Sequence, residues 1–258
     1  MLKTILPLAV LSTLVVGCTA SPTGRNQVLL YSTGDMSQLG AQSFDQIKQQ
    51  EKINTDPKLN NYVQCIADTL THYVDQPTSW DVVIFDSPQV NAFALPGGHI
   101  GVYTGLLKVA KTPSQLAAVM GHEIVHVTAN HSNERLSQSK ITNLGLQVTD
   151  YALQNQEYKD TAMQALGLGL QYGVVLPYGR TQESEADIVG LELMAKAGFD
   201  PEESVALWKN MAAASDGKQP PELLSTHPSH DTRIKDLRKA IAKLPAEYRQ
   251  PKELSCAY

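Results

Sequence analysis

Apolar residues recur at helical spacing along most of this 258-residue chain. Apolar positions three and four residues apart, with capping residues or proline before them and glycine after them, predict amphipathic helices. We expect helices over residues 36–52, 57–74, 112 to about 135, 180–197, 200 to about 214 and within 227–244, with a polar loop at 215–226. Residues 136–176 keep the helical spacing but contain four glycines, so a packed helix and a mobile cover are both open interpretations.

Three short runs instead alternate and are rich in β-branched or aromatic residues, which is typical of strands. These runs are Trp80–Phe85, Asn91–Leu95 and His99–Tyr103, and a Pro-Gly-Gly turn separates the last two. The pattern predicts one α+β domain over residues 36–258. It is mainly helical, with a small antiparallel sheet beside the helix that begins at residue 112.

The N-terminus has the pattern of a targeting segment. Lys3 precedes an apolar run from Ile5 to Val16, which is too short to span a bilayer and ends next to Gly17 and Cys18. This resembles a bacterial lipobox, which implies a signal peptide at residues 1–17 and a lipid on Cys18. An ordinary signal peptide with a cysteine by chance is the alternative.

Residues 18–35 are rich in Thr, Ser, Gly, Pro and Asn, and we expect them to form a tether between the lipid and the domain. In the lipoprotein pattern, a residue other than Asp after the cysteine favours the outer membrane of a Gram-negative cell, and here that residue is Thr19. We therefore expect a lipid-anchored protein on the periplasmic side of that membrane.

Two further cysteines remain if Cys18 carries lipid. Cys65 and Cys256 would then form a pair in an oxidising compartment, which predicts a disulfide between the C-terminal tail and an N-terminal helix. Two free thiols are the alternative. Neither cysteine has another Cys or His at metal-ligand spacing.

Composition narrows the classes of function. The apolar content of 42% is ordinary for a globular protein with a buried core. The net charge of −5 provides no basic surface for nucleic acid. Neither a P-loop nor a GxGxxG motif is present, so nucleotide binding has no support.

The run His122-Glu123-Ile124-Val125-His126 carries the clearest candidate chemistry. Residues i and i+4 of a helix lie on one face, so both imidazoles can bind one zinc ion. Glu123 is the neighbour of His122, and its carboxylate can accept a proton from a water at that ion.

A catalytic zinc site needs a third protein ligand. The metzincin pattern would place Gly at position 129 and His at position 132, but this chain has Ala129 and Ser132. His131 is five residues after His126, so we expect it to turn away from the ligand face as a surface or helix-packing residue. Downstream, the spacing of Glu183 and Asp187 places both carboxylates on one helical face, whereas Glu185 points elsewhere. A ligand carboxylate with a second carboxylate behind a ligand imidazole is a recurring zinc arrangement.

These motifs, followed in order by His227-Pro-Ser, resemble the M48 family of zinc metallopeptidases over residues 35–245. More narrowly, they resemble its small bacterial members attached to the outer membrane as lipoproteins, which lack the transmembrane helices of the heat-shock and CAAX-processing relatives. The resemblance implies a zincin-like fold and one Zn²⁺ per chain. The roles it implies are metal ligation by His122, His126 and Glu183, proton transfer by Glu123, and a supporting role for the acid Asp187.

The same resemblance implies a role for His227 on a mobile loop, where it either steadies the oxyanion or occupies the open metal position at rest. Arg233 matches an arginine that braces this loop, whereas His230 has no counterpart and is expected at the surface.

Substrate binding is the least defined prediction. The segment from Asn91 to Leu107 also resembles the family's strand pair ahead of the zinc helix. An extended peptide could pair with its edge by β-augmentation, and glycines in the turn would allow close approach. The candidate residues are Asn91, Ala92, Phe93, Ala94, Gly97 and Gly98. A plain structural hairpin is the alternative.

Three functions follow from these observations. The first is a zinc endopeptidase that degrades misfolded or unassembled envelope proteins, where the substrate class comes from the resemblance and the expected address. The second is a chaperone-like envelope lipoprotein whose zinc site is closed by His227. The third is a structural lipoprotein with a chance HExxH motif, which would bind no stoichiometric zinc.

Overall fold

The computed structural model describes residues 18–75, 79–153, 178–214, 223, 227, 232–254 and 256. The expected signal peptide at residues 1–17 lies outside this part of the chain. So do His230 and residues 154–176 of the expected cover, while residues 136–153 are helical.

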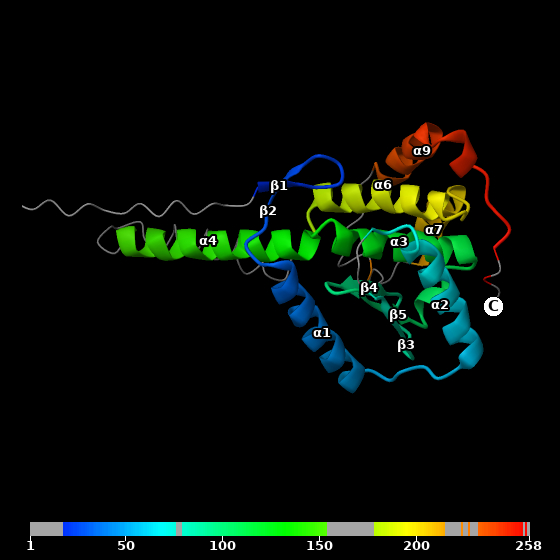
Figure 1. Cartoon of the computed structure of the whole chain (residues 1–258), viewed down its shortest axis with the longest axis horizontal. Helices are drawn as coiled ribbons and strands as arrows, with labels where there is room; N and C mark the ends of the chain where they lie inside the picture. Colours follow the sequence, from blue (N-terminus) through cyan, green and yellow to red (C-terminus); the bar gives the residue numbers. More distant parts are fainter. Residues whose placement is uncertain are drawn as a thin grey trace, which may run out of the picture.

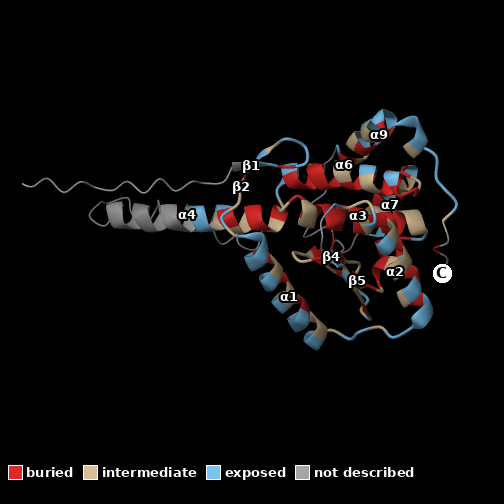
Figure 2. Ribbon diagram, viewed as in Figure 1, coloured by how far each residue is buried: buried red, intermediate tan, exposed pale blue. Residues whose placement is uncertain are grey.

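Two helices form the centre of the domain. α3 (Pro113–Thr128) and α6 (Arg180–Lys196) lie side by side (Figure 1), and both bury many of their residues (Figure 2). A Cβ atom at Gly190 would lie only 2.9 Å from the backbone nitrogen of His122. The absence of a side chain therefore lets the two backbones meet next to the HExxH motif.

The other helices surround this pair. α2 (Pro57–Thr71), α7 (Glu202–Ala214) and α9 (Arg233–Lys243) pack around α3 and α6, as Figure 1 shows. Short 3-10 helices cover Leu106–Lys108 and Ala246–Tyr248. Apolar side chains from α2, α3, α6, α7, α9 and the sheet form one continuous core. The mainly helical α+β class is confirmed.

The three-stranded sheet is mixed. β4 (Ala92–Leu95) and β5 (His99–Tyr103) form the expected antiparallel hairpin, but β3 (Asp81–Phe85) runs parallel to β5, so the strand order is β3-β5-β4. The expectation of a purely antiparallel sheet was therefore wrong. Three residues, Pro96-Gly97-Gly98, connect the paired Leu95 and His99, and the φ values of +94° at Gly97 and +88° at Gly98 are ones that glycine adopts readily. Because β4 occupies one edge of β5, β3 pairs with the other edge. β4 therefore lies at an edge of the sheet.

α1 (Thr33–Gln50) begins three residues before the expected start at residue 36. Ser32 caps it, since its side chain accepts a hydrogen bond from the Asp35 amide while the Asp35 carboxylate accepts one from the Ser32 amide. Phe44 on this helix packs against Phe85 and Tyr103 on the far face of the sheet.

The helix expected from residue 112 to about 135 is two helices. α3 ends at Thr128, and α4 (His131–Leu153) begins after Asn130, whose φ is +57°. Asn tolerates the left-handed region better than most residues, so a two-residue break is possible here. The break changes the direction of the side chains that follow, and α4 extends beyond the rest of the domain (Figure 1).

The segment expected to be a tether carries structure of its own. β1 (Cys18–Ala20) pairs with β2 (Asn26–Val28), and the loop between them packs against α4 and α6. Its buried polar contacts, described below, explain why a polar composition did not leave it free of the domain.

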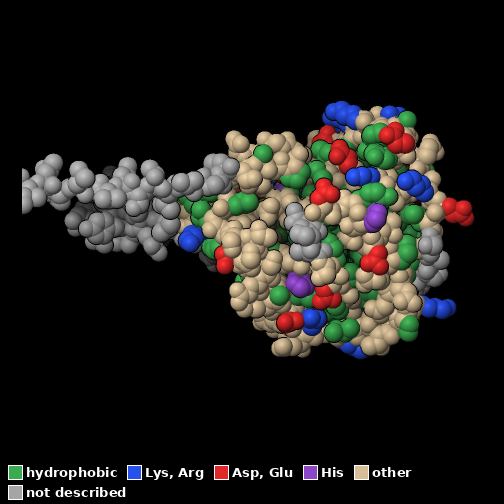
Figure 3. All heavy atoms as spheres, viewed as in Figure 1, with side chains coloured by type: hydrophobic (Ala, Val, Ile, Leu, Met, Phe, Trp, Pro, Cys, Tyr) green, Lys and Arg blue, Asp and Glu red, His purple; other side chains and the backbone are tan. Residues whose placement is uncertain are grey.

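Cys65 and Cys256 form a disulfide across 191 residues of sequence, as expected. It joins the C-terminal segment to α2. None of the described helices is both long enough and apolar enough to cross a membrane. Acidic and basic side chains are interspersed over the described part of the face in Figure 3, which agrees with the modest net charge.

Candidate metal centre

α3 presents the HExxH motif to the interior. Thr112 caps this helix by accepting a hydrogen bond from the Gln115 amide, and Pro113 occupies its first turn. His122, Glu123 and His126 are all at least 95% buried. Three polar side chains at that depth need partners, because burying an unpaired polar group costs about 1–3 kcal/mol.

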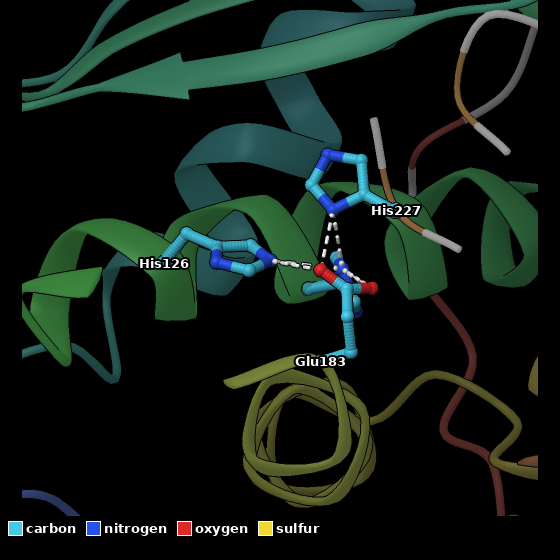
Figure 4. A group of neighbouring side chains, drawn as sticks. His126, Glu183 and His227 are labelled. Atoms are coloured by element: carbon cyan, nitrogen blue, oxygen red, sulfur yellow. Dashed lines mark hydrogen bonds and ion pairs between the residues drawn. The ribbon is translucent and has the colours of Figure 1, made fainter. Parts of the chain in front are cut away.

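Four of the predicted residues converge. One ligand atom from each of His122, His126, Glu183 and His227 lies within 4.8 Å of the other three. Figure 4 shows Glu183 rising from α6 between His126 of α3 and His227, which approaches from the opposite side.

The spacing of these atoms suits zinc. The His122 Nε2 atom lies 3.0 Å from His126 Nε2 and 3.2 Å from His227 Nδ1. Carboxylate oxygens of Glu183 lie 3.5 Å from both His122 Nε2 and His126 Nε2. Tetrahedral bonds of about 2.0–2.2 Å place ligand atoms roughly 3.3–3.6 Å apart, close to these separations. The donor set of three imidazoles and one carboxylate also fits this ion.

Asp187 and Arg233 support the centre from behind. The Asp187 Oδ1 atom lies 3.0 Å from His122 Nδ1, while Arg233 donates through Nε to Asp187 at 2.5 Å and through Nη2 to Glu183 at 2.8 Å. The guanidinium also lies 3.8 Å from the ring centroid of Trp208. The arginine expected to brace the His227 loop therefore contacts the two acidic side chains directly.

In the absence of a metal ion, the surroundings shift the pKa values of the His122 and His126 imidazoles in opposite directions. Burial lowers the pKa of His122, but hydrogen bonds to Asp187 and Glu183 outweigh it and raise the value to about 10. Burial also lowers the pKa of His126, and repulsion from His122 lowers it further. Burial would raise the pKa of Glu183, yet His122 and His227 bring it well below its usual range. The cluster thus favours a positive charge at its centre.

Glu123 lies beside this cluster. Burial raises the pKa of its carboxyl group, against the attraction of His227 and His122. Its Oε1 atom lies 3.4 Å from His227 Nε2 and has no hydrogen-bond partner among the described residues. A free, buried carboxylate oxygen at the rim of a metal cluster is placed to accept a proton from water.

Strand β4 passes next to Glu123. Asn91 O accepts a hydrogen bond from Tyr103 N, so the backbone groups of Ala92 and Ala94 point to the outer edge, where the Ala94 amide reaches the Glu123 carboxylate. Phe93 instead packs into the aromatic cluster on the other face of the sheet. Gly97 and Gly98 lie at the turn, where Gly97 approaches Ser37 of α1.

Four residues near the centre were missed or misread from the sequence. His131 is fully buried and lies 2.9 Å from His126, so its helix-packing interpretation is right and its surface interpretation is wrong. Glu185 contacts His131, and Arg25 contacts Glu185. Tyr178 stacks on the His126 ring with a centroid separation of 3.9 Å. The sequence signal was Glu185, the acidic residue between Glu183 and Asp187. Only the helix break at Asn130 directs His131 toward it.

The decisive comparison is with a family model described as peptidase family M48, which matches residues 55–241. The chain belongs to peptidase family M48. This confirms the family that the three motifs predicted, and the match includes both helices that carry the candidate ligands.

Several M48 relatives are similar over much of the chain. The mitochondrial metalloendopeptidase OMA1 of Schizosaccharomyces pombe is 36% identical over 162 residues, covering 62% of this chain and 46% of that protein. The mitochondrial metalloendopeptidase OMA1 of Danio rerio is 33% identical over 235 residues, covering 85% and 49%. The beta-barrel assembly-enhancing protease of Escherichia coli K12 is 28% identical over 214 residues, covering 80% and 44%. The chain thus spans about half or less of the length of these relatives.

Proposed function

We propose that this M48 protein is a zinc-dependent endopeptidase that cleaves misfolded or unassembled envelope proteins. The observation that carries the proposal is the convergence of His122, His126, Glu183 and His227 on one point, beside the Glu123 carboxylate, whose Oε1 atom has no hydrogen-bond partner among the described residues. Membership of a peptidase family supports it.

In this proposal His122, His126 and Glu183 hold one Zn²⁺ per chain. Asp187 keeps the His122 ring in place, and Arg233 holds both Asp187 and Glu183. When bound, the ion would polarise the scissile carbonyl. It would also lower the pKa of a water molecule from about 15.7, its value in bulk water, toward about 7.

Glu123 moves the proton. Its carboxylate accepts a proton from the attacking water at the free Oε1 atom and delivers it to the leaving amine. The burial that raises the pKa of this group helps it to hold the proton between the two steps. His227 Nε2, at 3.4 Å from Glu123, is placed to donate to the developing oxyanion.

The substrate would bind as an added strand on β4. The outward backbone groups of Ala92 and the outward carbonyl of Ala94 would offer hydrogen bonds to an extended peptide near Glu123. Such binding recognises backbone more than side chains, which favours unfolded segments. Asn91, Phe93, Gly97 and Gly98 would shape the strand and its turn rather than contact the reacting bond.

The cellular address is part of the same proposal. A lipid on Cys18 would anchor the protein to the periplasmic side of the outer membrane, where unassembled envelope polypeptides are its partners. Similarity to a bacterial protease named for enhancing β-barrel assembly supports this substrate class. Similarity to mitochondrial metalloendopeptidases supports the activity without specifying the compartment.

A second function is favoured by one observation. His227 Nδ1 lies 3.0 Å from Glu183 and 3.2 Å from His122, so it occupies the position that water and substrate need. A protein that remained in this state would bind zinc and unfolded polypeptides but would not cleave them. This is the chaperone-like alternative with a site closed by His227.

Casein degradation by the purified protein, with bound zinc measured on the same samples, tests these proposals. We expect cleavage by wild type and a loss of several orders of magnitude in Glu123→Gln with zinc retained. Glu202→Gln, the same substitution at an exposed position of α7, is the matched control and should remain active. His122→Ala should lose zinc.

His227→Ala distinguishes the two functions. A silent wild type that becomes active in His227→Ala would show self-inhibition, whereas an active wild type that is slowed by His227→Ala would support a role at the oxyanion. Cleavage by Glu123→Gln, or a wild type without zinc, would overturn the endopeptidase proposal.

A further inference from the structure

Each candidate histidine ligand of α3 has a second ring nitrogen that points away from the cluster. In His122 this nitrogen faces the Asp187 carboxylate, which Arg233 holds. In His126 it faces His131 instead, with 2.9 Å between the two Nδ1 atoms. His131 Nε2 lies 3.1 Å from Glu185 Oε2. Both imidazoles therefore lead to a carboxylate, one directly and one through a second histidine.

The chemistry of these contacts fixes the direction of each hydrogen bond. An ionised carboxylate only accepts, so His131 donates to Glu185 from Nε2. A neutral His131 then accepts at Nδ1, and His126 donates from its own Nδ1. The Nε2 lone pair of His126 is left facing the cluster, which is the state that a metal ligand needs.

Glu185 is held mainly by residues that precede α1. Its Oε1 atom accepts hydrogen bonds from the Thr23 amide at 2.9 Å and from the Thr23 hydroxyl at 2.6 Å. Its Oε2 atom accepts from Arg25 Nη2 at 2.9 Å. Both contacts come from the loop between β1 and β2. We call residues 21–28 the N-terminal strap.

The strap also supports the helix break that directs His131. Gln27 donates to the carbonyl of Ala129 at 2.8 Å and to Glu134 at 3.0 Å. Arg25 forms a two-point ion pair with Glu134. These contacts place one buried polar network under the start of α4, at the end of α3 that carries His126.

We propose that His131 and Glu185 are positioning residues for His126, and that the N-terminal strap completes this support through Arg25 and Thr23. The segment that follows the expected lipid-bearing cysteine would then tune the metal affinity of the centre. The inference rests on the proposed zinc ligation by His126.

Zinc affinity of the full chain, measured by competition with a chromophoric chelator, tests the inference. We expect His131→Phe, which keeps a planar aromatic ring but removes both nitrogens, to bind zinc about 10–100-fold more weakly. The zinc affinity of Glu185→Gln should also fall, and that of Arg25→Ala should fall by a smaller factor. The visible absorption spectrum of the Co²⁺-substituted protein should change in the same variants, because the orientation of one ligand changes.

Glu203→Gln is the matched control. The Glu203 carboxylate also accepts two hydrogen bonds, from the Thr112 hydroxyl at 2.9 Å and from the Gln115 side-chain amide at 2.7 Å, but it belongs to neither the strap nor the contacts of His131 in the described structure. We expect its thermal stability to fall like that of Glu185→Gln, while zinc affinity stays within about threefold of wild type and the Co²⁺ spectrum is unchanged.

The outcomes separate the inference from the proposed function. Wild-type affinity in both His131→Phe and Glu185→Gln would overturn the inference alone, and so would an equal loss in Glu203→Gln, which would show a general structural role. If His131→Phe does not fold, Glu185→Gln decides the question. A wild-type chain that binds no zinc would overturn both.

Discussion

The crossing of α3 and α6 leaves no room for a side chain, and Gly190→Ala tests how far the candidate centre depends on it. The added Cβ atom would lie 2.9 Å from His122 N and 3.0 Å from both Gly121 C and His122 Cα. All three are backbone atoms, so rotation of a side chain cannot relieve the clash. Ordinary contacts of this kind begin near 3.4 Å, and the helices would have to separate by about half an ångström.

Two opposing contributions set the size of the effect. Overpacking of a tight core typically costs about 1–3 kcal/mol, and replacing glycine by alanine inside a helix recovers about 1 kcal/mol. Because all three close contacts are with backbone atoms, we take the upper part of the overpacking range, about 2–3 kcal/mol, which leaves a net loss of about 1–2 kcal/mol in the free energy of unfolding. For a chain of this length, that loss lowers the melting temperature by roughly 2–8 °C. Zinc affinity should fall as well, because metal–ligand distances tolerate only about 0.2 Å of change.

Thermal unfolding and zinc competition on the purified protein measure both effects. Gly34→Ala in α1 is the matched control, because its added Cβ would meet only the Ser32 hydroxyl, at 3.7 Å. Its melting temperature and zinc affinity should match or slightly exceed those of wild type. If Gly190→Ala were as stable as Gly34→Ala and bound zinc equally well, the close approach of the two helices would not be what positions the ligands.

Three other changes should be measurable. Arg233→Met leaves Asp187 buried without its cation, so we expect a loss of about 3–5 kcal/mol in urea-induced unfolding, and a loss below 1 kcal/mol would contradict this brace. Burial would raise the pKa of Glu185, but hydrogen bonds from the strap and His131 lower it to about 2. Its contribution to stability is therefore complete above pH 4.5 and lost as the pH falls toward 2, so Glu185→Gln should flatten the pH dependence of unfolding over that range, and parallel curves would count against it. Reducing the disulfide between Cys65 and Cys256 should cost about 2–5 kcal/mol, and an unchanged melting temperature in dithiothreitol would show that it adds no stability.

The positions of the helices and strands were largely predictable because they depend on local signals. Asp56 and Pro57 mark the start of α2, and Thr112 and Pro113 mark that of α3. The two glycines of the β4–β5 turn identify the hairpin. The parallel pairing of β3 was not predictable, since it depends on which edge of β5 is left open.

The candidate ligands were predictable for a related reason. A spacing of four residues on one helix is a local property, and it pairs His122 with His126 and Glu183 with Asp187 whatever the rest of the chain does. The order of the motifs along the chain was enough to indicate the family, which the match over residues 55–241 confirms.

The support behind His126 could not be predicted in this way. His131 and Glu185 lie on different helices, and Arg25 comes from a segment whose polar composition indicated a tether. Their contact depends on a left-handed residue at Asn130, which ends α3 and redirects the next helix.

The sequence by itself determined the helical and strand segments, the spacing of the four motif residues and the family. The tertiary structure alone decided that α3 and α6 meet at Gly190, that His227 enters the cluster, and that residues 21–28 reach His131 through Glu185. The physical reason is range. Periodicity and capping act within a few residues, whereas the packing of two backbones and the pairing of buried charges join positions more than 40 residues apart and exist only in the folded chain.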